Sequence, residues 1–567
     1  DTSSKFYQES EYAENGQTSA ELDETGEHKT KYEYIEGTDI VRTTTLANGS
    51  KLSYGHGAGD IVTAITQSTE EGEENSNQTA YTCGVATEVR SGNNIIHYEY
   101  DHKRRITKVG MNGIESYQSN QYTDNTTESG ITGKVDKVIT TNAKGETFTS
   151  ITDKTGNLRK VLYGTTTLVA STYDSTNRLT SVTDNVDGTI TYEYDSLDRV
   201  TKIKKGTTEL ESYTYDDYGS ISKKMISNGV SHSYTYKYAD NASRELKAVE
   251  IGAENTIRYE KDCLGRIREK SVCAGTDSAT EKAPRIASEY YYYRKVGDHA
   301  TNQISTIRYG DNKDSKFVIG DSLKYAYDEM GNITKIYENG VFVVGYRYDK
   351  LNRLVREDNK KVNKTYVFSY DGNGNLVSKS ECAYTIKEKE ELTEIRTYHY
   401  GYEAGTDKLL GYNGQYLNVI NDYDKIGNPL KWFKTNEQGI TSEISGLSWS
   451  MGRRLTGFDG TSFRYNGQGQ RIAKTKNGKE IKFTYDSNGN IVKQSNGLEF
   501  MYDNSGVSGI RYDNAYYSYR KDIFGNIIGI LDKNGKIIVK YSYDAWGKNK
   551  VESDESENGL GELNPFR

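Results

Sequence analysis

Proline, cysteine and histidine are scarce in this chain of 567 residues, and long apolar runs are missing. The sequence holds 3 Pro, 4 Cys and 7 His. Few prolines suit a long hydrogen-bonded sheet, because proline cannot donate to the ladder. Four cysteines with no Cys-x-x-Cys pair exclude a disulfide scaffold. No stretch approaches the ~18 consecutive apolar residues of a membrane-spanning helix, so we expect no membrane span.

Charge and motif content exclude several classes of function. The formal net charge is −8 and no block of Lys or Arg is present, so we expect no nucleic-acid partner. The seven histidines show no metal-ligand spacing, which predicts no metal. No nucleophile elbow and no phosphate-binding loop occur. The sequence therefore predicts neither catalytic residues nor a cofactor.

What the chain has in abundance is tyrosine, 49 against 12 Phe, arranged in a repeated motif. Tyr-x-Tyr-Asp-x-x-Gly-(Arg/Asn)-(Leu/Ile) recurs with a spacing of 21 or 22 residues, and such a period marks a repeat architecture. Alternate residues of a strand share a face, so the two aromatics point the same way. The copies are Tyr98, Tyr100 and Asp101; Tyr192, Tyr194 and Asp195; Tyr213, Tyr215 and Asp216; Tyr325, Tyr327 and Asp328; Tyr346, Tyr348 and Asp349; Phe368, Tyr370 and Asp371; Phe483, Tyr485 and Asp486; and Tyr541, Tyr543 and Asp544.

The residue three positions after the Asp predicts the turn type. It is Gly219, Gly265, Gly331, Gly374, Gly489, Gly525 (after Asp522) or Gly547 in most copies, and Asn177, Asn352 or Asp198 in others. Gly, Asn and Asp are the residues that best tolerate positive φ. We therefore expect a left-handed residue that closes a type I turn with a bulge. Arg104 occupies this position in one copy and has no explanation at this level.

A second turn signal lies between these motifs, so each repeat is predicted to be a β-hairpin. Asn-Gly or Asp-Gly between alternating segments is a strong hairpin signal. The pairs are Asn112-Gly113, Asp187-Gly188, Asn228-Gly229, Asn339-Gly340, Asn477-Gly478, Asn496-Gly497 and Asn534-Gly535.

The number of hairpins then limits the architecture. Two strands per repeat give about 50 strands, and an open twisted sheet rarely exceeds ~10 strands without curling. Aliphatic residues are too few for a solid core. We expect an all-β fold, a spiral of antiparallel hairpins that forms a large hollow shell or barrel.

The fidelity of the repeats divides the chain. We predict degenerate repeats over 1–95, regular repeats over 96–270, an insertion over 271–320, repeats over 321–380, a second insertion over 381–420, repeats over 421–548 that lead into a core region, and a linker with the start of a closing motif over 549–567.

Three other features have a functional and a structural interpretation. The repeated carboxylates allow a glycosidase, but an Asp at every turn fits capping better. Asp371-x-Asn373-x-Asn375 resembles a calcium loop, yet Leu376 stands where Gly is required. Apolar residues just before the turn glycine either pack on a neighbouring coil, which we favour, or form a binding rim. These are Leu197, Leu264, Met330, Leu351, Ile426, Phe524 and Trp546.

The motif resembles the RHS or YD repeat of bacterial polymorphic toxins, of the Tc-toxin C component and of teneurins, and the resemblance covers nearly the whole chain. Trp449-Ser450-x-Gly452-Arg453 is similar to the family's late repeats, and Asn564-Pro565-Phe566-Arg567 to the opening of its closing motif. In the family that motif continues to an aspartyl self-cleavage site, which we expect beyond Arg567. We also expect a longer polypeptide at both ends, because no signal peptide is present at Asp1.

The resemblance implies a non-catalytic shell that encapsulates and delivers a C-terminal toxin, in bacterial competition or host interaction. Its partner would be that toxin, and its location secreted or cell-wall associated. The alternative is a cell-surface adhesin whose exposed aromatics bind glycans, and a glycoside hydrolase is the least favoured hypothesis.

Overall fold

The computed structural model describes residues 5–6, 9–69, 74–240, 243–278, 281–296, 299–313, 316–387, 392–436, 438–444 and 446–567. They form two compact units, each assembled from separate stretches of the chain. Unit 1 comprises Asp1–Gln78, Tyr234–Tyr398 and Phe500–Arg567, and unit 2 comprises Thr79–Ser233 and His399–Glu499. The chain passes between the units at β8 (Glu74–Thr82), β22 (His232–Tyr238), β34 (Glu394–Tyr402) and β45 (Glu499–Asp503).

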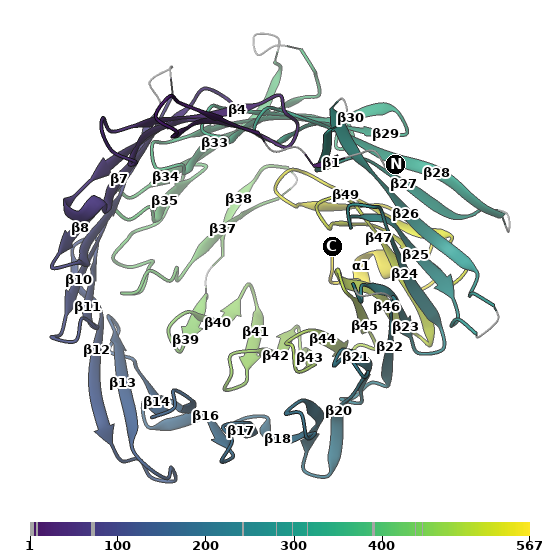
Figure 1. Cartoon of the computed structure of the whole chain (residues 1–567), viewed down its shortest axis with the longest axis horizontal. Coiled ribbons are helices and arrows are strands. Elements are labelled where there is room, and N and C mark those ends of the chain that lie inside the picture. Colours follow the sequence, from purple (N-terminus) through teal and green to yellow (C-terminus); the bar gives the residue numbers. More distant parts are fainter. Residues whose placement is uncertain are drawn as a thin grey trace. The chain divides into compact units, whose positions relative to one another are not determined.

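Unit 1 is built almost wholly of strands, drawn in purple, teal and yellow in Figure 1. Its first stretch contains one short 3-10 helix, η1 (Ala58–Asp60), and its last ends in the short helix α1 (Leu560–Leu563). The strands are β1 (Lys5–Phe6), β2 (Glu9–Tyr12), β3 (Thr18–Leu22), β4 (Lys29–Tyr34), β5 (Val41–Thr45), β6 (Lys51–His56) and β7 (Val62–Ser68); β23 (Leu246–Ile251), β24 (Asn255–Lys261), β25 (Ile267–Ala274), β26 (Arg285–Val296), β27 (His299–Lys313), β28 (Lys316–Tyr327), β29 (Ile333–Glu338), β30 (Val341–Tyr348), β31 (Leu354–Asn359), β32 (Lys364–Tyr370) and β33 (Leu376–Ala383); and β46 (Gly506–Tyr512), β47 (Ala515–Lys521), β48 (Ile527–Leu531), β49 (Ile537–Tyr543) and β50 (Asn549–Asp554).

Unit 2 contains an early and a late series of strands. The early series is β9 (Val85–Ser91), β10 (Asn94–Tyr100), β11 (Ile106–Met111), β12 (Ile114–Thr126), β13 (Val135–Asn142), β14 (Thr147–Asp153), β15 (Leu158–Tyr163), β16 (Thr166–Tyr173), β17 (Leu179–Asp184), β18 (Gly188–Tyr194), β19 (Val200–Lys205), β20 (Thr208–Tyr215) and β21 (Ile221–Ile226). The late series is β35 (Leu409–Tyr412), β36 (Gln415–Tyr416), β37 (Trp432–Thr435), β38 (Thr441–Ile444), β39 (Ser448–Ser450), β40 (Arg454–Phe458), β41 (Thr461–Tyr465), β42 (Arg471–Lys476), β43 (Lys479–Tyr485) and β44 (Ile491–Gln494).

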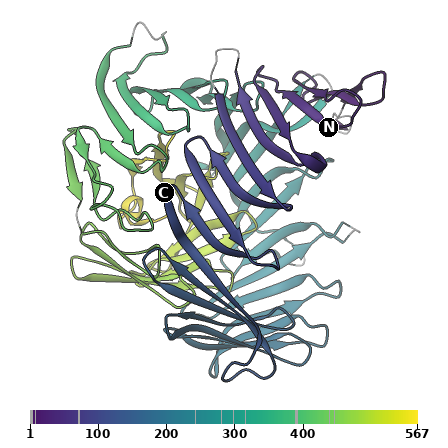
Figure 2. The same ribbon diagram turned by 90° about the vertical axis from the view of Figure 1, so that its left-hand side faces the viewer.

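Strands that follow one another in the chain pair antiparallel, so the sheets are series of hairpins. The strands of residues 79–142, dark blue in Figure 2, show this arrangement: β10 pairs with β9 on one side and with β11 on the other. A different pairing joins β1 to β27 in parallel within unit 1, with Lys5 opposite His299. This architecture of long antiparallel sheets confirms the predicted all-β fold.

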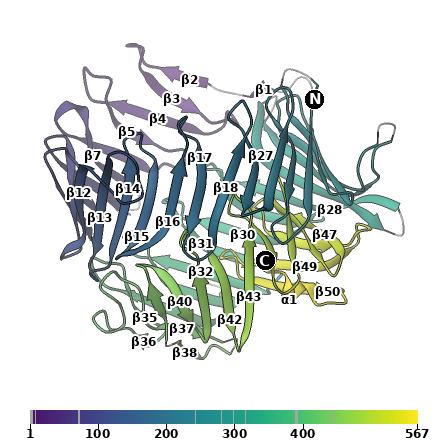
Figure 3. The ribbon, with the colours of Figure 1, turned by 90° about the horizontal axis from the view of Figure 1, so that it is seen from below.

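In unit 1 we call the strands of Asp1–Gln78 and Tyr234–Tyr398 early and those of Phe500–Arg567 late. The core of unit 1 lies between early and late strands. The buried side chains of Ile307 and Tyr309 on β27 and of Tyr325 on β28 form a cluster, against which Ile523 and Ile528 of the late stretch pack. The yellow late strands accordingly lie beside the teal strands in Figures 1 and 3. In unit 2 the late strands have a small cluster of their own. The apolar clusters of unit 1 thus lie where two series of strands meet.

The proposed insertions contain strands in their described parts. Residues 271–320 include β26, β27 and the start of β28, which continue the antiparallel series. Residues 279–280, 297–298 and 314–315 of this segment, and 388–391 of the second proposed insertion, lie outside the described residues. The domain boundaries given above stay a prediction.

Candidate functional site

The repeated turn is the smallest element of the candidate site. Each Tyr-x-Tyr pair ends a strand, as in β18, β20, β28, β30 and β49. At Asp328 the carboxylate Oδ1 accepts the backbone N–H groups of Met330 (2.9 Å) and Asn332 (2.8 Å). The N–H of Gly331 donates to the carbonyl of Asp328 (3.2 Å), and the strand pairing shifts register between Ala326 and Tyr327. The Asp therefore caps a turn that carries a bulge.

The fourth residue of the turn is left-handed in the repeats, as predicted. The φ angle is +81° at Gly331 and +87° at Gly219, and it stays positive where the residue is Asn177 (+71°) or Asp198 (+61°). Arg104 adopts φ +61° as well. Its backbone keeps the turn although a side chain with a Cβ disfavours this conformation.

The second tyrosine of the motif reaches the main chain of an earlier strand. The hydroxyl of Tyr194 donates to the carbonyl of Leu179, and that of Tyr215 to the carbonyl of Val200, both at 2.7 Å. Phenylalanine lacks this donor, which gives a reason for tyrosine at this position. The same contact, to a carbonyl 14–16 residues earlier, is made by Tyr100, Tyr348, Tyr370, Tyr485 and Tyr543.

The arginine of the motif joins consecutive repeats. The Nε of Arg178 donates to the Asp174 carboxylate of its own turn (2.7 Å), and its guanidinium lies 5.0 Å from the ring centroid of Tyr194 in the next repeat. Such cation–π contacts contribute about 0.5–1 kcal/mol at exposed sites. The same guanidinium contact occurs in the pairs Arg105–Tyr122, Arg199–Tyr215, Arg266–Tyr293 and Arg353–Tyr370.

Lysines of early repeats form ion pairs with the turn aspartates of late repeats. We call these ion pairs, together with the carboxylate contacts described next, the docking seam of each unit. In unit 2, the Nζ of Lys224 lies 3.1 Å from the Asp486 carboxylate and 3.4 Å from that of Glu211. All three side chains are buried. The other seam pairs are Lys144–Asp424 (3.3 Å) in unit 2, and Lys270–Asp503 (2.6 Å) and Lys379–Asp544 (3.8 Å) in unit 1.

Carboxylates on early strands complete the seam by accepting backbone N–H groups of late turns. The buried Asp184 accepts those of Gly467 (3.0 Å) and Gln468 (2.9 Å) as well as two from its own turn. Burial acts to raise the pKa of Asp184, but these four hydrogen bonds outweigh it and lower the pKa. Glu211 accepts the N–H of Ser487 (2.5 Å) in the same way.

In unit 1 the corresponding carboxylate is Glu357. It is fully buried and accepts the N–H of Ala545 (3.1 Å) and the amide of Asn359 (2.8 Å). Burial raises the pKa of Glu357, and the charge of nearby Asp544 adds to this effect. The two buried seam carboxylates, Asp184 and Glu357, thus differ in the direction of their pKa shift.

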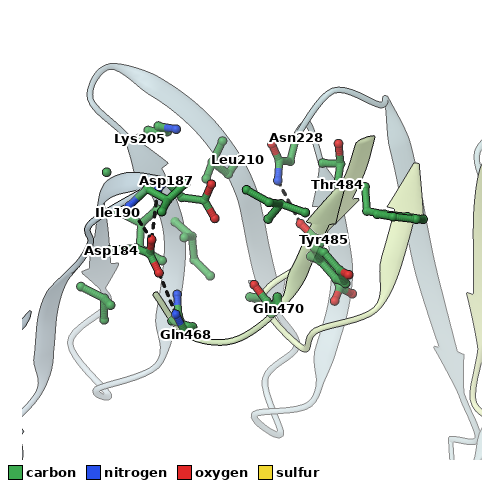
Figure 4. A pocket seen from close by; sticks show the side chains of 18 of the residues that line it. Asp184, Asp187, Ile190, Lys205, Leu210, Asn228, Gln468, Gln470, Thr484 and Tyr485 are labelled. Carbon is green, nitrogen blue, oxygen red and sulfur yellow. Dashed lines mark hydrogen bonds between the residues drawn. The ribbon is translucent and has the colours of Figure 1, made fainter. Parts of the chain in front are cut away.

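A cleft of about 540 Å³ remains between the early and late strands of unit 2. Figure 4 shows Asp184 and Gln468 bridging one end of it, and Asn228 bound to the carbonyl of Tyr485 at the other. Its walls mix apolar side chains such as Ile190 with polar ones such as Lys205. The cleft is therefore a space left between two docked surfaces, bounded by the contacts that dock them.

The seam residues could not be predicted from the sequence. Lys144, Lys224, Lys270 and Lys379 lie outside the repeated motif, and lysines and glutamates are common on strands of this chain. Their partners are distant in sequence: 262 residues separate Lys224 from Asp486. No local spacing marks such a pair.

The apolar residues before the turn glycine do not share one environment. Ile426 is buried, which fits the favoured interpretation of packing on another part of the chain. Trp546 contacts Phe368 of β32 edge-on at 5.6 Å but stays 54% exposed. Leu197 is 68% exposed and Phe524 57%, so the packing interpretation does not extend to them.

The remaining candidates of the sequence have structural surroundings. Asp371, in the calcium-like turn, accepts two backbone N–H groups and one Asn amide of its own turn. Asp486, in the turn Asp486-x-Asn488-x-Asn490 of the same spacing, makes the same three contacts. Cys83 and Cys263 are exposed, Cys273 and Cys382 are buried, and none of the four forms a disulfide. Within the ranges described above, no group of three or more His, Cys, Asp and Glu is placed to hold a metal ion. The helices found there are too short or too polar to cross a membrane.

Two family models match parts of this chain. The model described as RHS Repeat matches residues 173–210, and the model described as Teneurin YD-shell matches residues 448–560. The second match covers most of the late strands that dock through the seam.

Curated relatives share part of the sequence. The tRNA nuclease WapA of Bacillus subtilis (strain 168) is 28% identical over 224 residues, which are 37% of this chain and 8% of WapA. The tRNA3(Ser)-specific nuclease WapA of Bacillus spizizenii is 27% identical over 224 residues, again 37% of this chain and 8% of the relative. The matched stretch is thus a small part of each relative.

Solved structures share the fold over nearly the whole chain. The match to the crystal structure of TcdB2-TccC3-TEV covers 99% of this chain and 33% of the chain in that structure, with a TM-score of 0.54 and 13% sequence identity. A Tc holotoxin pore from Photorhabdus luminescens matches 97% and 32%, with a TM-score of 0.53 and 13% identity. At this identity the likeness concerns the fold alone.

Proposed function

Because the chain is an RHS/YD-repeat protein, we propose that it forms the wall of a non-catalytic shell that encloses and delivers a C-terminal effector. The proposed partner is the effector domain of the same polypeptide, and the proposed location is outside the producing cell. The fold shared with TcdB2-TccC3 and the sequence shared with WapA support this assignment to a carrier region.

The docking seam is the observation that carries the proposal. A wall that encloses a cargo must resist local opening, and single-layer sheets with few aliphatic residues bury little apolar surface to do so. In each unit the late turns are fixed to early strands by buried lysine–carboxylate pairs and by carboxylates that accept backbone N–H groups. Breaking one partner of a buried pair costs about 3–5 kcal/mol. The seam therefore supplies resistance where apolar burial is low.

Protease protection of a cargo tests the proposal. A protease-sensitive reporter domain is joined after Arg567, and in a control fusion the same reporter precedes Asp1. We expect the C-terminal reporter to be cleaved far more slowly than the N-terminal one, because cleavage requires the open form of the wall. A Lys224→Met, Lys379→Met double variant, which weakens the seam of both units, should restore cleavage.

Equal cleavage of both reporters in the unmodified chain would refute the carrier function. Saturable binding of the same chain to a glycan array would instead favour the adhesin. A seam variant that leaves the reporter protected would show that the seam does not keep the wall closed.

A further inference from the structure

Asp522 opens a late turn and has no lysine partner. Four other late turn aspartates, Asp424, Asp486, Asp503 and Asp544, each have a lysine of an earlier repeat within 4 Å. In the described part of the chain no Lys or Arg forms an ion pair with Asp522. The charge that a lysine balances at those four turns is therefore not balanced at Asp522.

Asp522 makes the hydrogen bonds of its turn, but no cation among the described residues balances its charge. Its carboxylate accepts the backbone N–H groups of Phe524 and Asn526, both at 2.9 Å, and the side-chain amide of Asn526 at 3.0 Å. Burial raises the pKa of Asp522 in spite of these hydrogen bonds. The adjacent Lys521 does not serve as the partner, since the charges that act on its ammonium are those of Lys270, Asp503 and Glu289.

A pocket of about 470 Å³ within unit 1 lies beside this carboxylate. Tyr346, Tyr348 and Phe524 contribute aromatic rings to its lining, Leu354 an aliphatic side chain, and Asp544 a second carboxylate. The pocket is therefore an aromatic enclosure open to solvent, with acidic groups in its wall.

The charge around the pocket is negative. Burial raises the pKa of the Tyr346 hydroxyl, and the carboxylates of Glu357, Asp522 and Asp544 raise it further. Lys379 compensates one of these charges, that of Asp544. The lining also includes Lys361, whose ammonium lies 2.8 Å from the Glu338 carboxylate and is engaged there.

We propose that this pocket binds an alkylammonium group, which pairs with Asp522 and lies against the rings of Tyr346, Tyr348 and Phe524. Aromatic faces attract organic cations within ~6 Å of the ring, and a carboxylate adds a charge-assisted hydrogen bond. The group is the one that lysine supplies at the four equivalent turns. A hard metal ion fits less well, because the pocket offers it mainly rings and aliphatic carbon.

Calorimetric titration of the full chain tests the site with matched probes. n-Butylammonium chloride is compared with n-butanol, and N-acetyl-lysine methylamide with its norleucine analogue, at neutral pH and low salt. We expect the two cationic probes to bind at a single site and their neutral partners to show no binding. Tighter binding of the lysine probe than of butylammonium identifies a polypeptide side chain as the source of the group, and equal binding identifies a free amine.

Three variants make the test specific. Asp522→Asn should weaken binding at least about tenfold, since a charge-assisted hydrogen bond is lost, and it should fold, because Asn466 occupies the same turn position in another repeat. Asp486→Asn, at a turn with a lysine partner in unit 2, should leave binding unchanged. Lys361→Met, which removes a lining cation that Glu338 already engages, should leave binding nearly unchanged. Equal affinity of butylammonium for the wild type and Asp522→Asn, or equal signals from butylammonium and butanol, would overturn the proposal.

Discussion

The two tyrosines of one motif have different hydrogen-bond partners in this fold. The second tyrosine points its hydroxyl along the sheet and hydrogen-bonds the main chain of an earlier strand. The first tyrosine has other partners: the hydroxyl of Tyr213 contacts Glu211 of its own strand and Ser487 of a late turn. Both positions bury an aromatic ring, which phenylalanine also supplies. Only the second position needs a hydroxyl that donates to the main chain, so phenylalanine replaces tyrosine at the first position alone, at Phe368 and Phe483.

Tyr215→Phe tests the contribution of the second hydroxyl. The variant keeps the ring and loses the hydrogen bond to Val200, so we expect a loss of about 1 kcal/mol in the free energy of unfolding. Tyr192→Phe, in the first position of the neighbouring repeat, is the control and should change stability less. Chemical denaturation measures both. Equal effects would show that the hydrogen bond to the main chain is not what matters.

Gly331 tests the left-handed turn residue. Its φ is +81°, a conformation that a β-branched residue adopts only with strain. Gly331→Val should therefore lower stability by about 1–2 kcal/mol. Gly331→Asn should be milder, since Asn177 and Asn352 occupy this position elsewhere. If thermal unfolding ranks the two variants equally, the backbone conformation does not control this site.

At this scale the sequence predicted the turns well, because each turn depends on residues within one repeat. The capping role of Asp328 and the positive φ of Gly331 and Asn177 follow from local rules. The positive φ of Arg104 could not be predicted, because arginine disfavours the left-handed conformation and the surrounding hairpin imposes it. The arginine–tyrosine contacts were missed because they join residues of different repeats.

At the scale of elements, the seam combines groups that are costly to bury singly. Lys224 is buried between Glu211 and Asp486, and Glu211 accepts the N–H of Ser487. Each group satisfies another, so the cost of removing one partner exceeds the strength of a single exposed ion pair.

Lys224→Met tests this cooperation. The substitution keeps an unbranched side chain of similar length and leaves two buried carboxylates without their cation, so we expect a loss of about 3–5 kcal/mol in unit 2. Lys154→Met removes an exposed pair with Asp136 and should change stability by less than about 1 kcal/mol. Hydrogen exchange of β20 and β21 reports the local effect. Comparable losses in the two variants would contradict the importance of burial.

Asp184→Asn should make the stability of unit 2 less dependent on pH. The folded-state pKa of Asp184 lies below the ordinary value of an aspartate. Its ionised carboxylate therefore stabilises the fold at neutral pH, and this contribution is lost as the pH falls through the folded-state pKa. At pH 7 we expect the variant to be less stable by about 2–3 kcal/mol. The difference from wild type should shrink in acid, as measured by thermal unfolding.

Glu357→Gln is the counterpart in unit 1. The raised pKa of Glu357 means that its contribution is present at low pH and is lost as the pH rises through that pKa. The stability of the variant relative to wild type should therefore improve as the pH rises. The same slope in both variants would show that the two carboxylates do not differ in this way.

The elements were predictable as hairpins but their docking was not. Strand ends such as Tyr194 and Tyr348 coincide with the motif, because alternation and turn residues are local signals. The seam joins residues far apart in the sequence: 188 positions separate Glu357 from Ala545, and 284 separate Asp184 from Gln468. Which early strand contacts which late turn depends on how the sheets curve. Because every repeat has the same period, the repeat pattern does not indicate which early repeat pairs with which late repeat.

At the scale of the whole molecule, each unit depends on the late repeats. A chain that ends at residue 447 lacks Gly467, Asp486 and Ser487, so it leaves Asp184, Glu211 and Lys224 buried without partners or exposed. We expect this truncated chain to lose amide protection in β17–β21, relative to the full chain, in hydrogen-exchange mass spectrometry. Protection equal to that of the full chain would show that the early strands are stable alone.

The division of unit 1 into three stretches sets an order for its synthesis. Its first stretch leaves the ribosome before any part of unit 2, and Phe500–Arg567 leaves it after all of unit 2. Lys270 and Glu357 therefore precede their partners Asp503 and Ala545 by many residues of synthesis, 188 of them for Glu357. Long-range contacts of this kind slow folding, and unpaired strands exposed meanwhile are prone to aggregate. A nascent chain of this topology needs protection until the stretch Phe500–Arg567 has emerged.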